Sequence, residues 1–180
     1  MIEKVIGRKN VLQAYRQVMS NQGSAGIDGM KVNQLWNHLN ENRNTIVTAV
    51  RNGSYLPQPI LGVAIPKSNG KIRLLGIPTV TDRLLQQAVS QVMSPLFELE
   101  FSEHSYGFRP NRNAHQALQQ AQKNIHEGYD HIVDIDLKNF FDEVDHVLLL
   151  QLIYRKVKCP RTLRLIRKWL RAPIVIEGQL

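Results

Sequence analysis

The sequence has a single cysteine, Cys159, among its 180 residues. One cysteine excludes an internal disulfide and a metal site built from several cysteines. The chain also lacks any apolar run near the roughly 20 residues that a membrane-spanning helix needs. Its first residues, Met1 to Lys4, lack the apolar core of a secretion signal. A reducing, cytoplasmic setting is therefore expected.

Acidic residues are the minority among the charges, with 15 against 23 Lys and Arg, so the net charge is +8. A positive excess of this size favours a polyanionic partner, of which nucleic acid is the commonest. A generic basic surface is the alternative that composition alone leaves open. Hydrophobic residues make up 43% of the chain, which suits a packed core and excludes a disordered tail. The six histidines show no metal-ligand spacing.

Hydrophobic periodicity and turn residues predict an α+β chain. Helices are expected near 11–18 and at 33–40, 44–52, 79–101, 113–127, 145–157 and 160–171. Asn69-Gly70 predicts the turn of a β-hairpin with strands near 60–65 and 72–77. A buried strand is expected at 129–137, and a further strand begins in 172–178.

Two carboxylates stand together in the predicted strand at 129–137. Strand geometry places the apolar residues of this segment on one face, and Asp134 and Asp136 on the other. Two acids on an otherwise apolar strand are costly unless a cation lies between or beyond them. That cation is either a Lys or Arg side chain or a divalent metal, and Mg²⁺ prefers carboxylate oxygens. The alternative is a strand end at which both acids are solvated.

The same segment continues as Asp136-Leu137-Lys138-Asn139-Phe140-Phe141-Asp142, an acid followed by a turn with two aromatics. Three blocks precede it: Gly-Ile-Asp-Gly at 26–29, the stretch 66–83, and Ser-Tyr-Gly-Phe-Arg-Pro-Asn-Arg at 105–112. Together the four blocks cover nearly the whole chain and resemble the reverse transcriptases encoded by group II introns, with the Asp136 block as motif A. The block at 26–29 favours this type over a retron, diversity-generating or CRISPR-associated reverse transcriptase.

The resemblance implies a right-hand polymerase fold, with mostly helical fingers that carry a β-hairpin, then the first part of an antiparallel palm sheet with packed helices. Residues 1–56 would be an N-terminal extension of the fingers. Residues 57–128 would be the fingers hairpin and helices that run into the palm, and 129–180 a partial palm. The family's glutamine-glycine-glycine motif would begin near Gln179 and its YADD-type motif further on, so the chain is expected to be truncated before both.

The resemblance also implies nucleotidyl transfer with two Mg²⁺ ions. Asp136 would be the catalytic metal ligand, and Leu137 would add its backbone carbonyl. Asp134 would not bind the metal ion itself but would support the segment that carries Asp136. Phe141 would pack against the incoming sugar and exclude a 2′-hydroxyl, whereas Phe140 would face the core.

Basic side chains would contact the nucleotide and the RNA. On the hairpin, Lys67 and Arg73 would grip the triphosphate. Candidate RNA contacts are Lys71, Arg109, Arg112, Arg161, Arg164, Lys168 and Arg171, the last four on one side of the helix at 160–171. No acid interrupts the sequence between Gln151 and Ala172. For the helix at 160–171, the alternative to RNA binding is a basic face that only contacts solvent. For the loop at 102–110, the alternative is that its aromatic side chains pack against the core.

The expected function is therefore an RNA-directed DNA polymerase of a mobile group II intron that also binds intron RNA to assist splicing. Its partners would be intron RNA or an RNA template, a DNA primer and dNTPs. The sequence is compatible with a homodimer, and no membrane contact is expected. The bacterial cytoplasm or nucleoid is the expected location. The 180 residues alone are expected to be inactive. The alternative from another class is a non-catalytic RNA-binding or maturase module.

Overall fold

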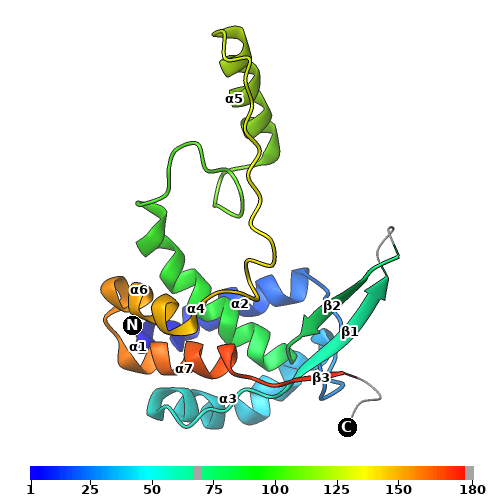
Figure 1. Cartoon of the computed structure of the whole chain (residues 1–180). Coiled ribbons are helices and arrows are strands. Elements are labelled where there is room, and N and C mark those ends of the chain that lie inside the picture. The colour runs from blue at the N-terminus through cyan, green and yellow to red at the C-terminus, as the bar shows by residue number, and fades with distance from the viewer. Residues whose placement is uncertain (67–69, 177–180) are drawn as a thin grey trace. The chain divides into compact units, whose positions relative to one another are not determined.

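The computed structural model describes residues 1–66 and 70–176. The chain divides into two compact units (Figure 1). Met1–Ser94 and His146–Leu180 form the first, here called the core unit, and Pro95–Asp145 form the second, here called the inserted unit. Among the described residues, no helix combines the length and the apolar character needed to cross a membrane.

Helices build most of the core unit. They are α1 Ile2–Val5, α2 Arg8–Ser20, the 3-10 helix η1 Val32–Gln34, α3 Leu35–Asn52, α4 Val80–Glu98, α6 His146–Val157 and α7 Pro160–Leu170. The last residues of α4, from Pro95 on, belong to the inserted unit. Apolar side chains of these helices, α6 excepted, meet in one core, in which Val5, Leu35 and Leu84 are almost fully buried.

Helix α3 is longer than the sequence pattern predicts. The two helices expected at 33–40 and 44–52 are one continuous helix, because the residues between them include neither glycine nor proline. In this stretch Asn42 donates a side-chain hydrogen bond of 3.1 Å to the His38 carbonyl within the helix. The helix ends at Gly53, whose φ of 76° is the left-handed conformation that glycine favours at a helix C-terminus.

The predicted hairpin is confirmed as strands β1 Ile60–Pro66 and β2 Ile72–Ile77, which pair antiparallel. A third strand, β3 Ile174–Ile176, pairs with β1 in parallel, so the sheet is mixed and has the order β2-β1-β3. Figure 1 shows β3 beside β1, although more than a hundred residues separate them along the chain. The α+β class is confirmed.

A buried carboxylate ties the start of α4 to two other parts of the core unit. The side chain of Asp82 is 2% exposed and accepts four hydrogen bonds. Its Oδ1 accepts from Tyr55 Oη and Trp169 Nε1, both at 2.9 Å. Its Oδ2 accepts from the Gln58 backbone N–H at 3.1 Å and from Thr79 Oγ1 at 2.9 Å. Asp82 therefore links the segment before β1, the start of α4 and α7.

The glycine block at 26–29 packs against the same end of α4. A Cβ on the buried Gly26 would lie 2.7 Å from Thr79 Cα and 2.8 Å from Thr79 N, so only glycine fits there. Gly29 has a φ of 67°, and the Met30 N–H donates to Asp28 Oδ1 at 3.2 Å. The glycine at the start of this block therefore has a structural role, because it lets the backbone before η1 approach the start of α4 closely.

The inserted unit contains the end of α4, a loop, helix α5 Ala114–His126 and an extended stretch. Asn113 caps α5 in a reciprocal pair with Gln116, through hydrogen bonds of 3.0 Å and 2.9 Å. None of the apolar residues of 95–145, all of which the structure describes, is buried. This unit consequently has no hydrophobic core of its own.

Candidate functional site

The segment that carries Asp134 and Asp136 is extended but forms no strand, so the buried strand expected at 129–137 is wrong. Its apolar side chains are exposed, with Val133 at 82% and Ile135 at 80%. A strand needs a neighbour to pair its backbone N–H and C=O groups. Within residues 1–66 and 70–176, the three strands form one sheet of the core unit, and none pairs with this segment. Asp134, Asp136 and the Leu137 backbone therefore lie on exposed chain of the inserted unit.

The turn after Leu137 is locally ordered. Asn139 adopts a φ of 51°, and its carbonyl accepts hydrogen bonds from the backbone N–H groups of Asp142 at 2.9 Å and Glu143 at 3.1 Å. Phe140 and Phe141 pack edge to face, with ring centroids 5.4 Å apart. Phe141 is 88% exposed. Phe140 is 50% exposed, so the expectation that it faces the core is wrong.

A divalent metal site for phosphoryl chemistry needs several convergent carboxylates. In the part of the chain that the structure describes, no group of three or more His, Cys, Asp or Glu side chains is placed to hold an ion. Asp134 and Asp136 supply suitable donor atoms, but both are exposed and neither is joined by further ligands. The described residues therefore do not form a complete metal site.

The hairpin residues lie in the other unit. Arg73 is exposed on β2 opposite Ile65 of β1, and Lys71 is exposed just before β2 begins. Lys67 lies outside the described residues. Arg73 therefore lies on a regular strand, and the pairing of this strand with β1 fixes the face of the sheet on which its side chain begins.

Arg109 organises the loop that precedes α5. Its guanidinium forms an ion pair with Glu98 at 2.8 Å, and it also donates to the carbonyls of Ser102 and Ser105. The guanidinium carbon lies 5.3 Å from the centroid of the Phe101 ring. Because its side chain is only 8% exposed, Arg109 is engaged in holding this loop together.

Arg112 is the other basic residue predicted in this loop. Its guanidinium carbon lies 5.5 Å from the centroid of the Tyr106 ring, a cation–π distance. Phe108, which follows Tyr106 by two residues, has a φ of 55° and is fully exposed. The loop aromatics therefore differ: Tyr106 is partly covered and Phe108 is not.

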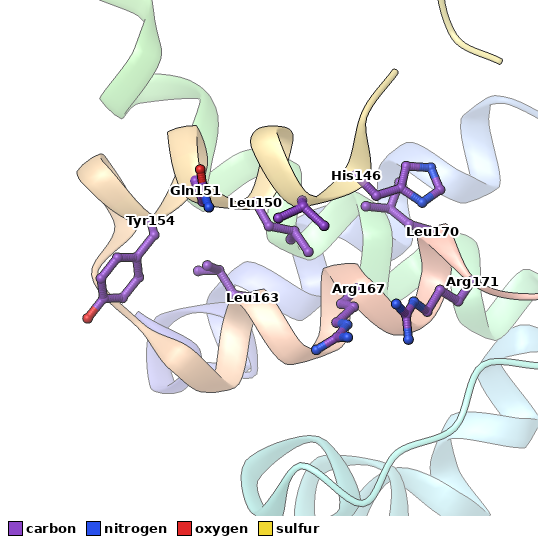
Figure 2. Close-up of a pocket in the computed structure, with 9 residues that line it drawn as sticks. His146, Leu150, Gln151, Tyr154, Leu163, Arg167, Leu170 and Arg171 are labelled. Atoms are coloured by element: carbon purple, nitrogen blue, oxygen red, sulfur yellow. The ribbon is translucent and has the colours of Figure 1, made fainter. Parts of the chain in front are cut away.

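Helix α7 divides its basic residues between two surroundings. Lys168 Nζ donates to the carbonyls of Gly53 at 2.8 Å and Tyr55 at 2.6 Å, so this amine fastens α7 to the end of α3. Arg161 is exposed in the first turn. Arg171, together with Arg167, lines a pocket of about 420 Å³ between α6 and α7 (Figure 2).

Three functional candidates were missed by the sequence patterns. Arg167 belongs to the same basic arc of the helical wheel as Arg164 and could have been found from that spacing. Asp82 lies in the first turn of α4, and no local pattern indicates its role because three of its hydrogen-bond donors belong to Tyr55, Gln58 and Trp169. Cys159 precedes α7, and its thiol accepts from Thr162 Oγ1 at 3.3 Å. Burial raises the pKa of this thiol, but hydrogen bonds from Thr162 and the Ile2 backbone outweigh burial and lower the pKa to about 7.

Comparison with known proteins gives a consistent family. Residues 65–180 match the family described as reverse transcriptase (RNA-dependent DNA polymerase). The group II intron-encoded protein LtrA of Lactococcus lactis subsp. cremoris is 38% identical over 160 residues, which cover 88% of this chain. Protein YkfC of Escherichia coli is 34% identical over 172 residues, or 92% of this chain. The mitochondrial nuclear intron maturase 1 of Arabidopsis thaliana is 31% identical over 107 residues, or 58% of this chain.

These relatives are longer proteins. The aligned part is 26% of LtrA, 45% of YkfC and 15% of the Arabidopsis maturase. The chain therefore corresponds to about a quarter of LtrA and to less than half of YkfC.

Proposed function

Because the chain belongs to the reverse transcriptase family, we propose that it forms the fingers and the first part of the palm of a group II intron-encoded reverse transcriptase. In this proposal the whole protein copies RNA into DNA from a DNA primer and dNTPs, and it binds its intron RNA to assist splicing. The observation that carries it is the alignment with LtrA over 88% of this chain. Residues 1–56, 57–128 and 129–180 keep the proposed roles of N-terminal extension, fingers and partial palm.

Enzymes of this family generally use divalent metal ions, which activate the attacking hydroxyl and stabilise the leaving pyrophosphate. We propose Mg²⁺ as the ion, with Asp136 and the Leu137 carbonyl supplying part of its coordination shell. Asp134 then supports this segment. The segment is exposed, so it would take its final conformation when a neighbouring strand pairs with it.

Nucleotide contacts are proposed at the hairpin and at the turn after Leu137. Arg73, with Lys67 outside the described residues, would bind the triphosphate through charge-assisted hydrogen bonds. Phe141 would contact the sugar, and its 88% exposure leaves the ring accessible to such a ligand. RNA contacts are proposed for Lys71, Arg109, Arg112, Arg161, Arg164, Lys168 and Arg171. Among them, Arg109 and Lys168 already bind protein groups, so their contribution is expected to be the smallest.

A non-catalytic maturase is the second candidate, favoured by the similarity to the Arabidopsis nuclear intron maturase. Primer extension on an RNA template by a full-length protein that carries this chain distinguishes the two. A reverse transcriptase should extend the primer, Asp136→Asn should nearly abolish turnover, and RNA affinity should stay within about twofold, because base and phosphate contacts lie elsewhere. Lack of extension with retained binding of the intron RNA would select the maturase. Full activity of Asp136→Asn would contradict the assignment of this residue.

The role of Phe141 is tested separately in the same assay. Phe141→Ala removes the ring beside the sugar, so ribonucleotides should compete better with deoxyribonucleotides while the overall turnover with dNTPs changes little. Phe140→Ala is the matched control, because it removes the adjacent ring of the same pair. If both variants show the same preference for deoxyribonucleotides over ribonucleotides, a side chain other than Phe141 excludes the 2′-hydroxyl.

A further inference from the structure

A groove between α6 and α7 in the core unit is lined by two of the proposed RNA contacts, Arg164 and Arg171, and by apolar side chains to which the polymerase proposal assigns no role. Its floor is apolar, formed by Val147 and Leu150 of α6 and by Leu163 and Leu170 of α7. Figure 2 shows Leu150 and Leu163 projecting into the groove from the two helices, with Tyr154 toward one end. Its volume of about 420 Å³ lies within the usual range for small-ligand sites.

The groove continues past Tyr154. A second hollow of about 360 Å³ shares Leu150, Tyr154 and Leu163 with the first, and it extends toward Pro160 and Arg164. The apolar surface is therefore an elongated channel along the two helices. Tyr154 lies where the two hollows meet, and it is 48% exposed, so its ring is accessible from the channel.

One side of the channel carries a row of arginines. Arg164 and Arg167 lie on α7, and Arg171 directly follows its last residue. Their spacings of three and four residues correspond to steps of about 4.5 and 6 Å along a helix axis. Within residues 1–66 and 70–176, no carboxylate forms an ion pair with any of these three guanidinium groups. The row is consequently able to bind successive anionic groups.

This combination fits one class of ligand. An apolar floor with an aromatic ring accommodates a base, and a row of guanidinium groups binds the backbone phosphates, as in sites for single-stranded nucleic acid. A duplex would engage the arginines but would keep its bases stacked away from the floor. An acidic amphipathic peptide could use both surfaces, but the net charge of +8 favours the more highly charged RNA.

We propose that the groove between α6 and α7 binds a single-stranded segment of RNA. An unpaired base lies over Leu150 and Leu163 beside Tyr154, and phosphates bind Arg164, Arg167 and Arg171. This inference rests on the proposed RNA-binding function and names the site and the form of the RNA. It also assigns Arg167 to the RNA contacts.

The test uses the purified chain with two fluorescein-labelled probes, an oligouridine and a short RNA duplex, in anisotropy titrations at several salt concentrations. Arg167→Gln should weaken oligouridine binding and lower the log–log salt slope by about 0.7, the value for one lost phosphate contact on a single strand. Arg43→Gln is the matched control, because Arg43 is an exposed arginine of α3 and its replacement removes the same charge. The control should change affinity by less than about twofold.

The base contact is tested with Tyr154→Ala. Loss of stacking should weaken oligouridine binding by about 5-fold or more, while duplex binding changes by less than about twofold. Circular dichroism verifies that the variants keep their helices. Equal oligouridine affinities of Arg167→Gln, Tyr154→Ala and the control would place RNA elsewhere on the chain and overturn the groove proposal alone. Equal losses for duplex and single strand in Tyr154→Ala would refute the base contact, and failure of the unmodified chain to bind either probe would refute RNA binding as well.

Discussion

Replacement of Asp82 by asparagine removes the charge at the centre of four hydrogen bonds without changing the size of the side chain. The amide oxygen can still accept from Tyr55 and Trp169, which both donate to Oδ1 at 2.9 Å. The new amide group, however, faces two donors, the Gln58 N–H and the Thr79 hydroxyl. The hydroxyl can rotate and accept, but the Gln58 N–H then loses its partner.

The magnitude follows from these contacts. An unsatisfied buried donor costs about 1–3 kcal/mol, and the remaining bonds weaken because their acceptor is no longer charged. We therefore expect Asp82→Asn to lower the free energy of unfolding by about 2–4 kcal/mol, a large part of the 5–15 kcal/mol typical of a domain. Relief of the cost of burying a charge offsets some of this loss.

Urea unfolding followed by tryptophan fluorescence measures the effect, because Trp36 and Trp169 both belong to the core unit. With an m-value of about 1–3 kcal/mol/M, the midpoint should fall by about 1–2 M. Tyr55→Phe is the matched control: it removes one donor to Asp82 and leaves the carboxylate, so it should cost about 1–2 kcal/mol. The reasoning is refuted if Asp82→Asn is no less stable than Tyr55→Phe.

Three further predictions concern other parts of the chain. The pKa of Cys159 is lowered to about 7, so its thiolate is populated above this pH. The rate of alkylation of Cys159 should therefore reach half its maximum near pH 7. Thr162→Ala removes a hydrogen bond to the sulfur and should move the pH of half-maximal alkylation upward. Gly26→Ala should destabilise the chain by about 1–3 kcal/mol in urea unfolding, whereas Gly107→Ala, which has open space around the new methyl group, should have little effect. Limited proteolysis should cleave first within 95–145, where no apolar residue is buried; a first cleavage in the core unit would contradict this.

Local signals predicted most of the elements. Asn69-Gly70 between two apolar runs indicated the hairpin, Gly53 the end of α3, and Asn113 the start of α5, because each depends on residues close in sequence. The α+β class followed from the same signals.

The parts that failed depend on distant partners. The strand expected at 129–137 has the right alternation, but a strand forms only where another strand pairs with it. The hydrogen bonds of Asp82 come from positions 55, 58, 79 and 169, a combination that no local pattern contains. Lys168 lies on the basic side of the helical wheel, yet it binds carbonyls of Gly53 and Tyr55 because α7 packs beside the end of α3. The roles of Asp136 and Phe141 remain predictions.

The division of the core unit into two stretches of sequence also affects how the chain folds during synthesis. The first stretch ends at Ser94, but β1 lacks its parallel neighbour and Asp82 lacks the Trp169 hydrogen bond until β3 and α7 have been made. Translation of residues 95–176 takes about 4–16 s at about 5–20 residues per second. During this interval the first stretch of the core unit exposes an unpaired edge of β1, and Asp82 lacks one of its four hydrogen bonds. A ribosome-bound chaperone that shields strand edges would therefore be needed most while the inserted unit is being translated.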